Sequence, residues 1–126
     1  MPARLRRRGM RAMTQKDWRV RVEDMLEAID RIESYVDGMN TAQFVADSRT
    51  QDAVIRNLEI LGEASKRIPF DIIQRHPELP WSRIGDMRNI LVHEYHSVDP
   101  EIILDAARND LPPLVAPLKT LLADKG

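Results

Sequence analysis

The sequence predicts an all-α protein, in which four main helices form an up-and-down bundle with one or two short helices between them. The first observation is periodicity, because apolar residues recur every three or four positions in four long stretches. The second is that no stretch alternates apolar and polar residues for long enough to form a strand. The third is that helix start and stop residues bound these stretches, including Gly38, Pro69 and the pair Asp99 and Pro100.

The first half of the chain predicts two long helices and a short one. The first long helix spans about residues 16–37 and ends at Gly38, and Asn40 or Thr41 caps a short helix that ends near Asp47. Ser48 or Thr50 starts the second long helix, which Pro69 stops. The expected buried stripe of the first helix is Trp18, Val22, Met25, Ile29, Ile32 and Val36, and that of the second is Val54, Leu58, Leu61, Ala64 and Ile68.

The second half predicts a short helical turn over residues 70–75, a loop, and two further helices. His76 lies in the loop and is interpreted as an ordinary surface histidine, and a helix runs from Trp81 or Ser82 to His93. Asp99 caps the last helix and Pro100 takes its first position. Its expected apolar side is Ile102, Ile103, Ala106 and Leu111, and a kink or restart is expected at Pro112, Pro113 and Pro117 before Leu118, Leu121 and Leu122.

The length and composition predict one domain in a reducing compartment. A chain of 126 residues is long enough to bury a core without covalent cross-links. The chain contains no cysteine, so disulfides, thiolate metal ligands and a cysteine nucleophile are excluded. No apolar run approaches membrane-spanning length, and the basic start is not followed by the apolar stretch of a secretory signal. A cytoplasmic protein with no membrane association is expected.

The charge of the chain is unevenly distributed. Residues 1–13 carry five arginines and no periodic apolar face, which predicts a disordered basic arm ahead of a helical domain over residues 14–126. This arm is either a tail that binds RNA or an extension that the fold does not need. Without its arginines, 14 basic residues remain against 20 acidic ones, so the body has a charge of about −6. An acidic body is unusual for sequence-independent nucleic-acid binding.

Polar side chains interrupt the apolar helix that starts near Trp81. Arg88, Asn89 and His93 lie beside a buried stripe, where polar groups need partners. Asn89 and His93 are four residues apart and share a face, whereas Arg88 and His93 are five apart and point about 140° away from each other. The two groups converge either if the last turn unwinds near His93 or if two copies of the helix meet across a two-fold axis. They form either a structural pair or a functional site.

Other candidate sites are weaker. Arg56 and Glu63 lie two turns apart on one helix face, either as solvated charges or as support for Arg88 or His93. His93, Glu94, His96 and Asp99 cluster in the sequence as a rival metal site. Their spacing lacks the His-Glu-x-x-His pattern of a zinc helix, so no metal is expected. There is no glycine-rich phosphate loop, and six aromatic residues offer few platforms for stacked bases. No cofactor is therefore expected.

The segment from Arg88 to Tyr95 resembles the signature of HEPN ribonucleases: an arginine, four residues, a histidine, any residue and a tyrosine. Residues 56–64, the step from Pro80 to Trp81, and residues 98–112 are similar to further segments of the HepT-like toxin family. The likeness covers about residues 17–122. It implies a HEPN-like bundle and a metal-independent endoribonuclease. His93 would transfer protons, Arg88 would stabilise the phosphate, and Asn89 would position the imidazole or a phosphate oxygen.

The resemblance also implies partners. In HepT-like toxins, the position of Tyr95 is adenylylated by a minimal nucleotidyltransferase, the antitoxin MntA. The expected partners are cellular RNA, a second copy of the chain and this antitoxin, with a larger assembly of toxin and antitoxin as a further option. His96 places a second imidazole beside the signature and is a candidate to assist it. The alternative function is a non-catalytic binding partner of a nucleotidyltransferase, which the acidic body favours.

Overall fold

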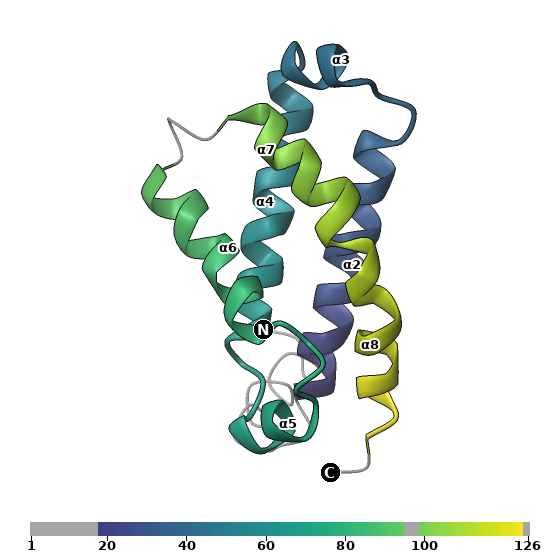
Figure 1. Cartoon of the computed structure of the whole chain (residues 1–126), viewed down its shortest axis with the longest axis vertical. Coiled ribbons are helices and arrows are strands. Elements are labelled where there is room, and N and C mark those ends of the chain that lie inside the picture. Colours follow the sequence, from purple (N-terminus) through teal and green to yellow (C-terminus); the bar gives the residue numbers. More distant parts are fainter. Residues whose placement is uncertain (1–17, 95–98, 125–126) are drawn as a thin grey trace, which may run out of the picture.

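The computed structural model describes residues 18–94 and 99–124, without the side chains of residues 88–94. The described residues are helical and contain no strand, so the all-α prediction is confirmed (Figure 1). The basic arm over residues 1–13 lies outside the described part. The elements are α2 (Trp18–Val36), α3 (Thr41–Val45), α4 (Ser48–Ser65), α5 (Phe70–Arg75), α6 (Trp81–Glu94), α7 (Pro100–Asp105), the π-helical turn η2 (Ala106–Asp110) and α8 (Pro112–Leu122).

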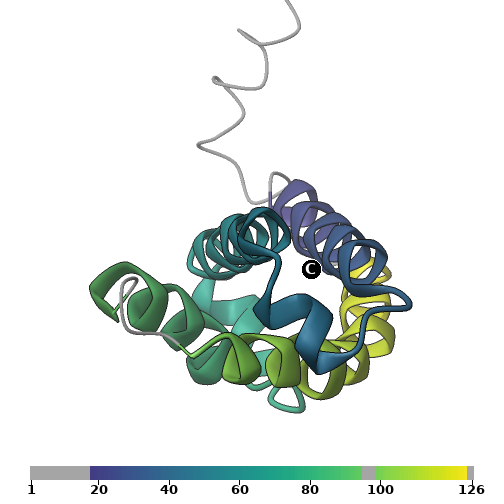
Figure 2. The ribbon, with the colours of Figure 1, turned by 90° about the horizontal axis from the view of Figure 1, so that it is seen from above.

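The long helices run alternately up and down, as the sequence predicts (Figure 1). Helix α4 packs against both α2 and α6, and α8 packs against α2. The run of α7, η2 and α8 returns along the bundle as its fourth member (Figures 1 and 2). Helix α6 lies at the edge of the bundle, where its main helical neighbour is α4. Among the described helices, none is long and apolar enough to cross a membrane.

The core confirms the two predicted stripes of the first half. Every residue of the α2 stripe is at most 5% exposed, and the same holds for the stripe of α4 together with Ile68. Phe44 of α3 is fully buried and closes one end of the core. Gly62 is also buried on α4, the helix against which α6 packs. Apolar burial of this extent is the main force that stabilises a bundle.

Side-chain caps fix where the helices begin. The Asn40 side chain accepts a hydrogen bond from the Gln43 amide, and the Gln43 side chain accepts one from the Asn40 amide, which completes a capping box. The Asp47 carboxylate accepts hydrogen bonds from the Thr50 amide and hydroxyl, which lower its pKa. Gly38 has a φ of 74°, a left-handed conformation that glycine adopts without strain after α2.

The last predicted helix differs from expectation in its buried face. Asp99 and Pro100 start α7 as predicted, but Ile102 is 65% exposed, so its assignment to the core is wrong. Ala106 is only half-buried. The face that packs inward is Ile103, Leu104, Ala107 and Leu111.

The π-helical turn explains how two adjacent prolines are accommodated. The Leu111 amide donates to the Ala106 carbonyl at 3.2 Å, a bond over five residues. Pro112 and Pro113 have no amide hydrogen to donate to the preceding turn, so regular α-helical bonding cannot continue through them. A new helix therefore restarts at Pro112, as one of the two predicted outcomes, and Pro117 lies inside it without ending it.

Candidate functional site

Helix α6 carries the Arg88, Asn89 and His93 positions on continuous helical backbone. It begins at Trp81 and remains helical through Glu94. The structure therefore gives no unwound turn that would bring Arg88 toward His93, and their attachment points are about 140° apart around the axis. The side chains of these three residues lie outside the described part, and so do Tyr95 and His96 entirely.

The first half of α6 anchors the motif helix to the bundle. Ile84 is fully buried and Met87 packs against the core. Gly85 lies near the residue that follows α4, because a Cβ atom built on it would lie 3.6 Å from Cε of Lys66. The second half, which holds the motif, follows directly from this anchored segment. In Figure 1 the carboxyl end of α6 points away from α2 and α8.

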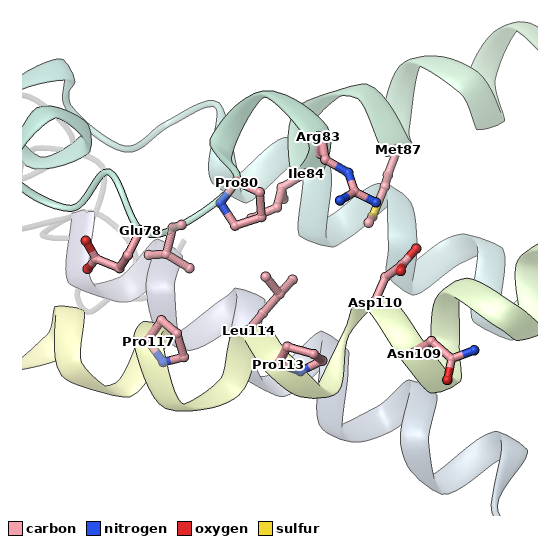
Figure 3. A pocket seen from close by; sticks show the side chains of 11 residues that line it. Glu78, Pro80, Arg83, Ile84, Met87, Asn109, Asp110, Pro113, Leu114 and Pro117 are labelled. Atoms are coloured by element: carbon pink, nitrogen blue, oxygen red, sulfur yellow. The ribbon is translucent and has the colours of Figure 1, made fainter.

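A groove of about 260 Å³ separates the first half of α6 from η2 and the start of α8. Ile84, Met87 and Leu114 give it apolar walls. Arg83 and Asp110 extend over it from opposite sides (Figure 3). On α6 the groove is lined as far as Met87, the residue before Arg88.

Arg56 and Glu63 line a second, more polar groove of about 400 Å³ between α2 and α4. The Arg56 side chain is 72% exposed, and its guanidinium lies 3.8 Å from the carboxylate of Glu59. An ion pair this exposed adds little to the stability of the fold. The structure brings Arg56 and Glu63 to one groove, which agrees with their predicted common face. Their support of Arg88 or His93 stays a prediction.

Asp99, the last member of the rival metal cluster, has a structural role. Its carboxylate accepts a hydrogen bond from the Glu101 amide at 2.9 Å and caps α7. The side chains of the other members, His93, Glu94 and His96, are not described. Among the side chains that are described, no three His, Asp or Glu residues gather into a metal-binding group.

The interpretation of His76 as an ordinary surface histidine is wrong. Its side chain is only 14% exposed, with Nε2 at 2.6 Å from the Asp124 carboxylate and Nδ1 at 3.1 Å from that of Glu78. The hydrogen bond to Asp124 raises the pKa of His76 above the ordinary 6.5, against the opposing effect of burial, and Glu78 raises it further. The loop's two prolines indicated an exposed turn, and nothing in the sequence marked Asp124 as a partner 48 residues away.

A family model described as "Ribonuclease HepT-like" matches residues 25–121, which include the whole of α6 and the Tyr95 position. The chain belongs to the HepT-like ribonuclease family. Among its relatives, "Probable ribonuclease HepT" of Thermococcus cleftensis is 44% identical over 93 residues, which are 74% of this chain and 84% of the relative. "Putative RNase MJ0127" of Methanocaldococcus jannaschii is 36% identical over 112 residues, or 89% of this chain and 93% of the relative.

A further relative extends the comparison. "Putative RNase TTE0752" of Caldanaerobacter subterraneus is 34% identical over 101 residues, which are 80% of this chain and 90% of the relative. No solved structure matches the chain. The HepT-like match thus runs from Met25 within α2 to Leu121 within α8, and the motif lies inside it.

Proposed function

We propose that this HepT-like protein is a metal-independent endoribonuclease that cleaves cellular RNA in the cytoplasm as the toxin of a toxin–antitoxin pair. The observation that supports it most is the position of Arg88 and His93 on α6, inside the region that matches a ribonuclease family. Among the matched relatives, several carry ribonuclease names. RNA is the substrate class that these names indicate.

The proposed chemistry uses the ribose as the nucleophile. The 2′-oxygen attacks the adjacent phosphorus, the bond from phosphorus to the 5′-oxygen breaks, and a 2′,3′-cyclic phosphate and a 5′-hydroxyl form. His93 takes the proton of the 2′-hydroxyl, since an imidazole titrates near neutral pH. The leaving 5′-oxygen takes a proton from water, and His93 then returns its proton to the solvent. Arg88 stabilises the charge that develops on the phosphate oxygens. Asn89, four residues before His93 and therefore on the same face, positions the imidazole or a phosphate oxygen.

A homodimer supplies the convergence that one α6 lacks. The Arg88 and His93 positions are about 140° apart around the axis of a regular helix, so one phosphodiester would not easily contact both from a single α6. A two-fold axis beside α6 would place Arg88 of each protomer near His93 of the other. The position of α6 at the edge of the bundle leaves it accessible to a second copy (Figure 2).

Tyr95 is the proposed point of control. Its phenol oxygen would attack the α-phosphate of ATP on an MntA-like nucleotidyltransferase, pyrophosphate would leave, and AMP would remain on the tyrosine. Tyr95 follows His93 by two residues, so the added phosphoester would place negative charge and bulk beside the proposed phosphate site. RNA would then be repelled and blocked from Arg88.

Expression of the chain in a host without the nucleotidyltransferase is expected to stop growth, because cellular RNA is cut. Coexpression of the nucleotidyltransferase is expected to restore growth and to add one AMP group to Tyr95. The Tyr95→Phe chain has no phenol oxygen and is expected to stay toxic with the partner present. Growth curves and the mass of the purified chain are the two measurements.

The same experiment separates the enzyme from a non-catalytic partner of the nucleotidyltransferase, which the acidic body favours. The matched control is His93→Ala, which is expected to be harmless in the host without the partner. Equal toxicity of the wild-type and His93→Ala chains would contradict RNA cleavage as the cause. A harmless wild-type chain that binds the nucleotidyltransferase without gaining AMP would support the binding partner instead.

A further inference from the structure

A cluster of charged groups joins three elements at the lower end of the bundle. Asp124 follows the end of α8, and its side chain is 11% exposed. Its carboxylate accepts hydrogen bonds from Nη2 of Arg75 at 2.8 Å and Nε at 3.3 Å, and it lies 2.6 Å from Nε2 of His76. Arg19 of α2 donates to the Asp124 backbone carbonyl. The end of α8 is thereby tied to α2, α5 and the loop after α5.

The hydrogen-bonding geometry of His76 matches its protonated form. Both ring nitrogens face a carboxylate, Nε2 that of Asp124 at 2.6 Å and Nδ1 that of Glu78 at 3.1 Å. A neutral imidazole carries one N–H and can donate to only one of them, whereas the imidazolium donates to both. The neutral form would also place a nitrogen lone pair against a carboxylate. Proton loss therefore weakens one of the two contacts.

The surrounding charges act in both directions. The carboxylates of Asp124 and Glu78 favour the imidazolium, and the guanidinium of Arg75 beside Asp124 opposes it. Asp71 lies 3.9 Å from Arg75 and offsets part of that positive charge. The net result is a raised pKa of His76, with the Asp124 hydrogen bond as its largest cause.

His76 is also joined to the start of the motif helix. Its backbone carbonyl accepts a hydrogen bond from Nε1 of Trp81 at 2.9 Å. Trp81 is the first residue of α6 and packs against the core. Seven residues further along α6 is Arg88, and twelve residues further is His93. A displacement of the loop at His76 would therefore also displace Trp81 and the first turn of α6, the helix that carries the motif.

We propose that protonated His76 is a clasp between the end of α8 and the start of α6, and that it is a positioning residue for the motif helix. Its effect on RNA cleavage rests on the proposed function, but the clasp itself does not. The clasp is closed when His76 donates to both Asp124 and Glu78. It loosens when His76 loses its proton, and the first turn of α6 then opens more often.

The direction of the pH dependence follows from the raised pKa. The unfolded chain titrates His76 near the ordinary 6.5, and the folded chain above it. The stabilisation is therefore fully present below pH 6.5 and is lost as the pH rises through the folded pKa. Opening of the α6 first turn and of the end of α8 is expected to increase severalfold over that range.

Amide hydrogen exchange tests the clasp without any need for activity. Wild-type chain and His76→Gln are compared between pH 6 and pH 9, with rates corrected for intrinsic exchange. Glutamine keeps an N–H donor but does not titrate. We expect the wild-type peptides that cover residues 79–87 and 118–124 to lose protection as the pH rises, with no such step in His76→Gln. Peptides of α2 and α4 serve as internal references.

A matched variant isolates the role of the clasp. Asp71→Asn alters a charge that touches Arg75 but not His76, so it is expected to keep a pH-dependent loss of protection, at a pH no higher than in wild type because Arg75 then opposes the imidazolium more strongly. Other titrating groups, His93 and His96 included, are present in all three chains, so only His76 accounts for a difference. The proposal would be overturned if wild type and His76→Gln lost the same amide protection as the pH rises. It would also be overturned if wild type lost none.

Cleavage of total cellular RNA by the same chains adds the positioning test. Because glutamine replaces only one of the two contacts, we expect His76→Gln to cleave RNA severalfold more slowly than wild type below pH 6.5. We also expect it to lack the part of the wild-type decline in activity that accompanies the loss of amide protection at higher pH. If no chain cleaves RNA, the proposed function fails while the exchange result still decides the clasp. If all chains cleave RNA with one pH profile, the positioning role is wrong.

Discussion

His93→Ala is expected to abolish RNA cleavage by this chain. The imidazole is the proposed base for the 2′-hydroxyl, and a positioned acid or base contributes about 10²–10⁴-fold to such reactions. Alanine leaves no group in that position that can accept a proton near neutral pH. The measurement is the rate of cleavage of one RNA by purified wild-type and variant chains under single-turnover conditions.

A matched control keeps this result specific to the motif. Arg83→Ala changes an exposed charged residue on the same helix, ten residues before His93, and is expected to cleave RNA at the wild-type rate. Circular dichroism spectra and thermal midpoints of both variants are compared with those of wild type, so that a loss of cleavage in a folded variant is assigned to the missing side chain. Cleavage by His93→Ala within a few-fold of wild type would remove His93 from the mechanism.

Mixing Arg88→Ala with His93→Ala is expected to restore activity that neither chain has alone. If each site takes Arg88 from one protomer and His93 from the other, a mixed dimer has one complete site and one that lacks both groups. Equal amounts of the two chains, unfolded and refolded together, form mixed dimers in about half of all cases, so about a quarter of the wild-type activity should return. Arg88→Ala alone should lose about 10²–10³-fold, the effect of removing one group that stabilises a developing charge.

The mixing experiment needs proof that mixed dimers form. Native mass spectrometry of the refolded sample resolves them, because the two variants differ in mass. Each variant refolded by itself supplies the baseline. Mixed dimers with no gain over that baseline would show that Arg88 and His93 act from one protomer, and the two-fold site would then be wrong.

The helices of the first half could be predicted because local signals and packing agree there. The stripes that start at Trp18 and Val54 repeat every three or four residues, and every member is buried. Asn40 and Gln43 form the cap that the sequence predicts near that position. In this part of the chain the apolar repeat, the helix cap and the packing of the core all favour the same helices. The sequence alone was therefore sufficient to predict them.

The last helix shows what periodicity alone misses. Ile102 is apolar and lies beside Ile103, yet it is exposed because Ile103, Leu104 and Ala107 are the residues that face the core. The π-helical turn before Pro112 shifts the register of the following residues by widening one turn. A regular helical repeat cannot predict a turn of this kind.

The clasp could not be predicted because its members are distant in sequence. His76 and Glu78 lie in the loop, whereas Asp124 follows the last helix, and only the fold brings them together. The two prolines that follow His76, Pro77 and Pro80, indicated a turn correctly but carried no information about the burial of His76. The Arg88 and His93 positions were identified by their family signature, and the structure adds that both lie on one unbroken helix.

The most direct test of the proposed ribonuclease is the dependence of cleavage on the 2′-hydroxyl in the absence of metal. Cleavage sites are first mapped in total RNA, and a synthetic RNA with one such site is then incubated with the purified chain in EDTA. We expect cleavage with a 2′,3′-cyclic phosphate end, and none when the ribose before the cleaved bond is replaced by 2′-deoxyribose. Equal cleavage of the deoxy substrate, or cleavage that EDTA abolishes, would contradict the mechanism.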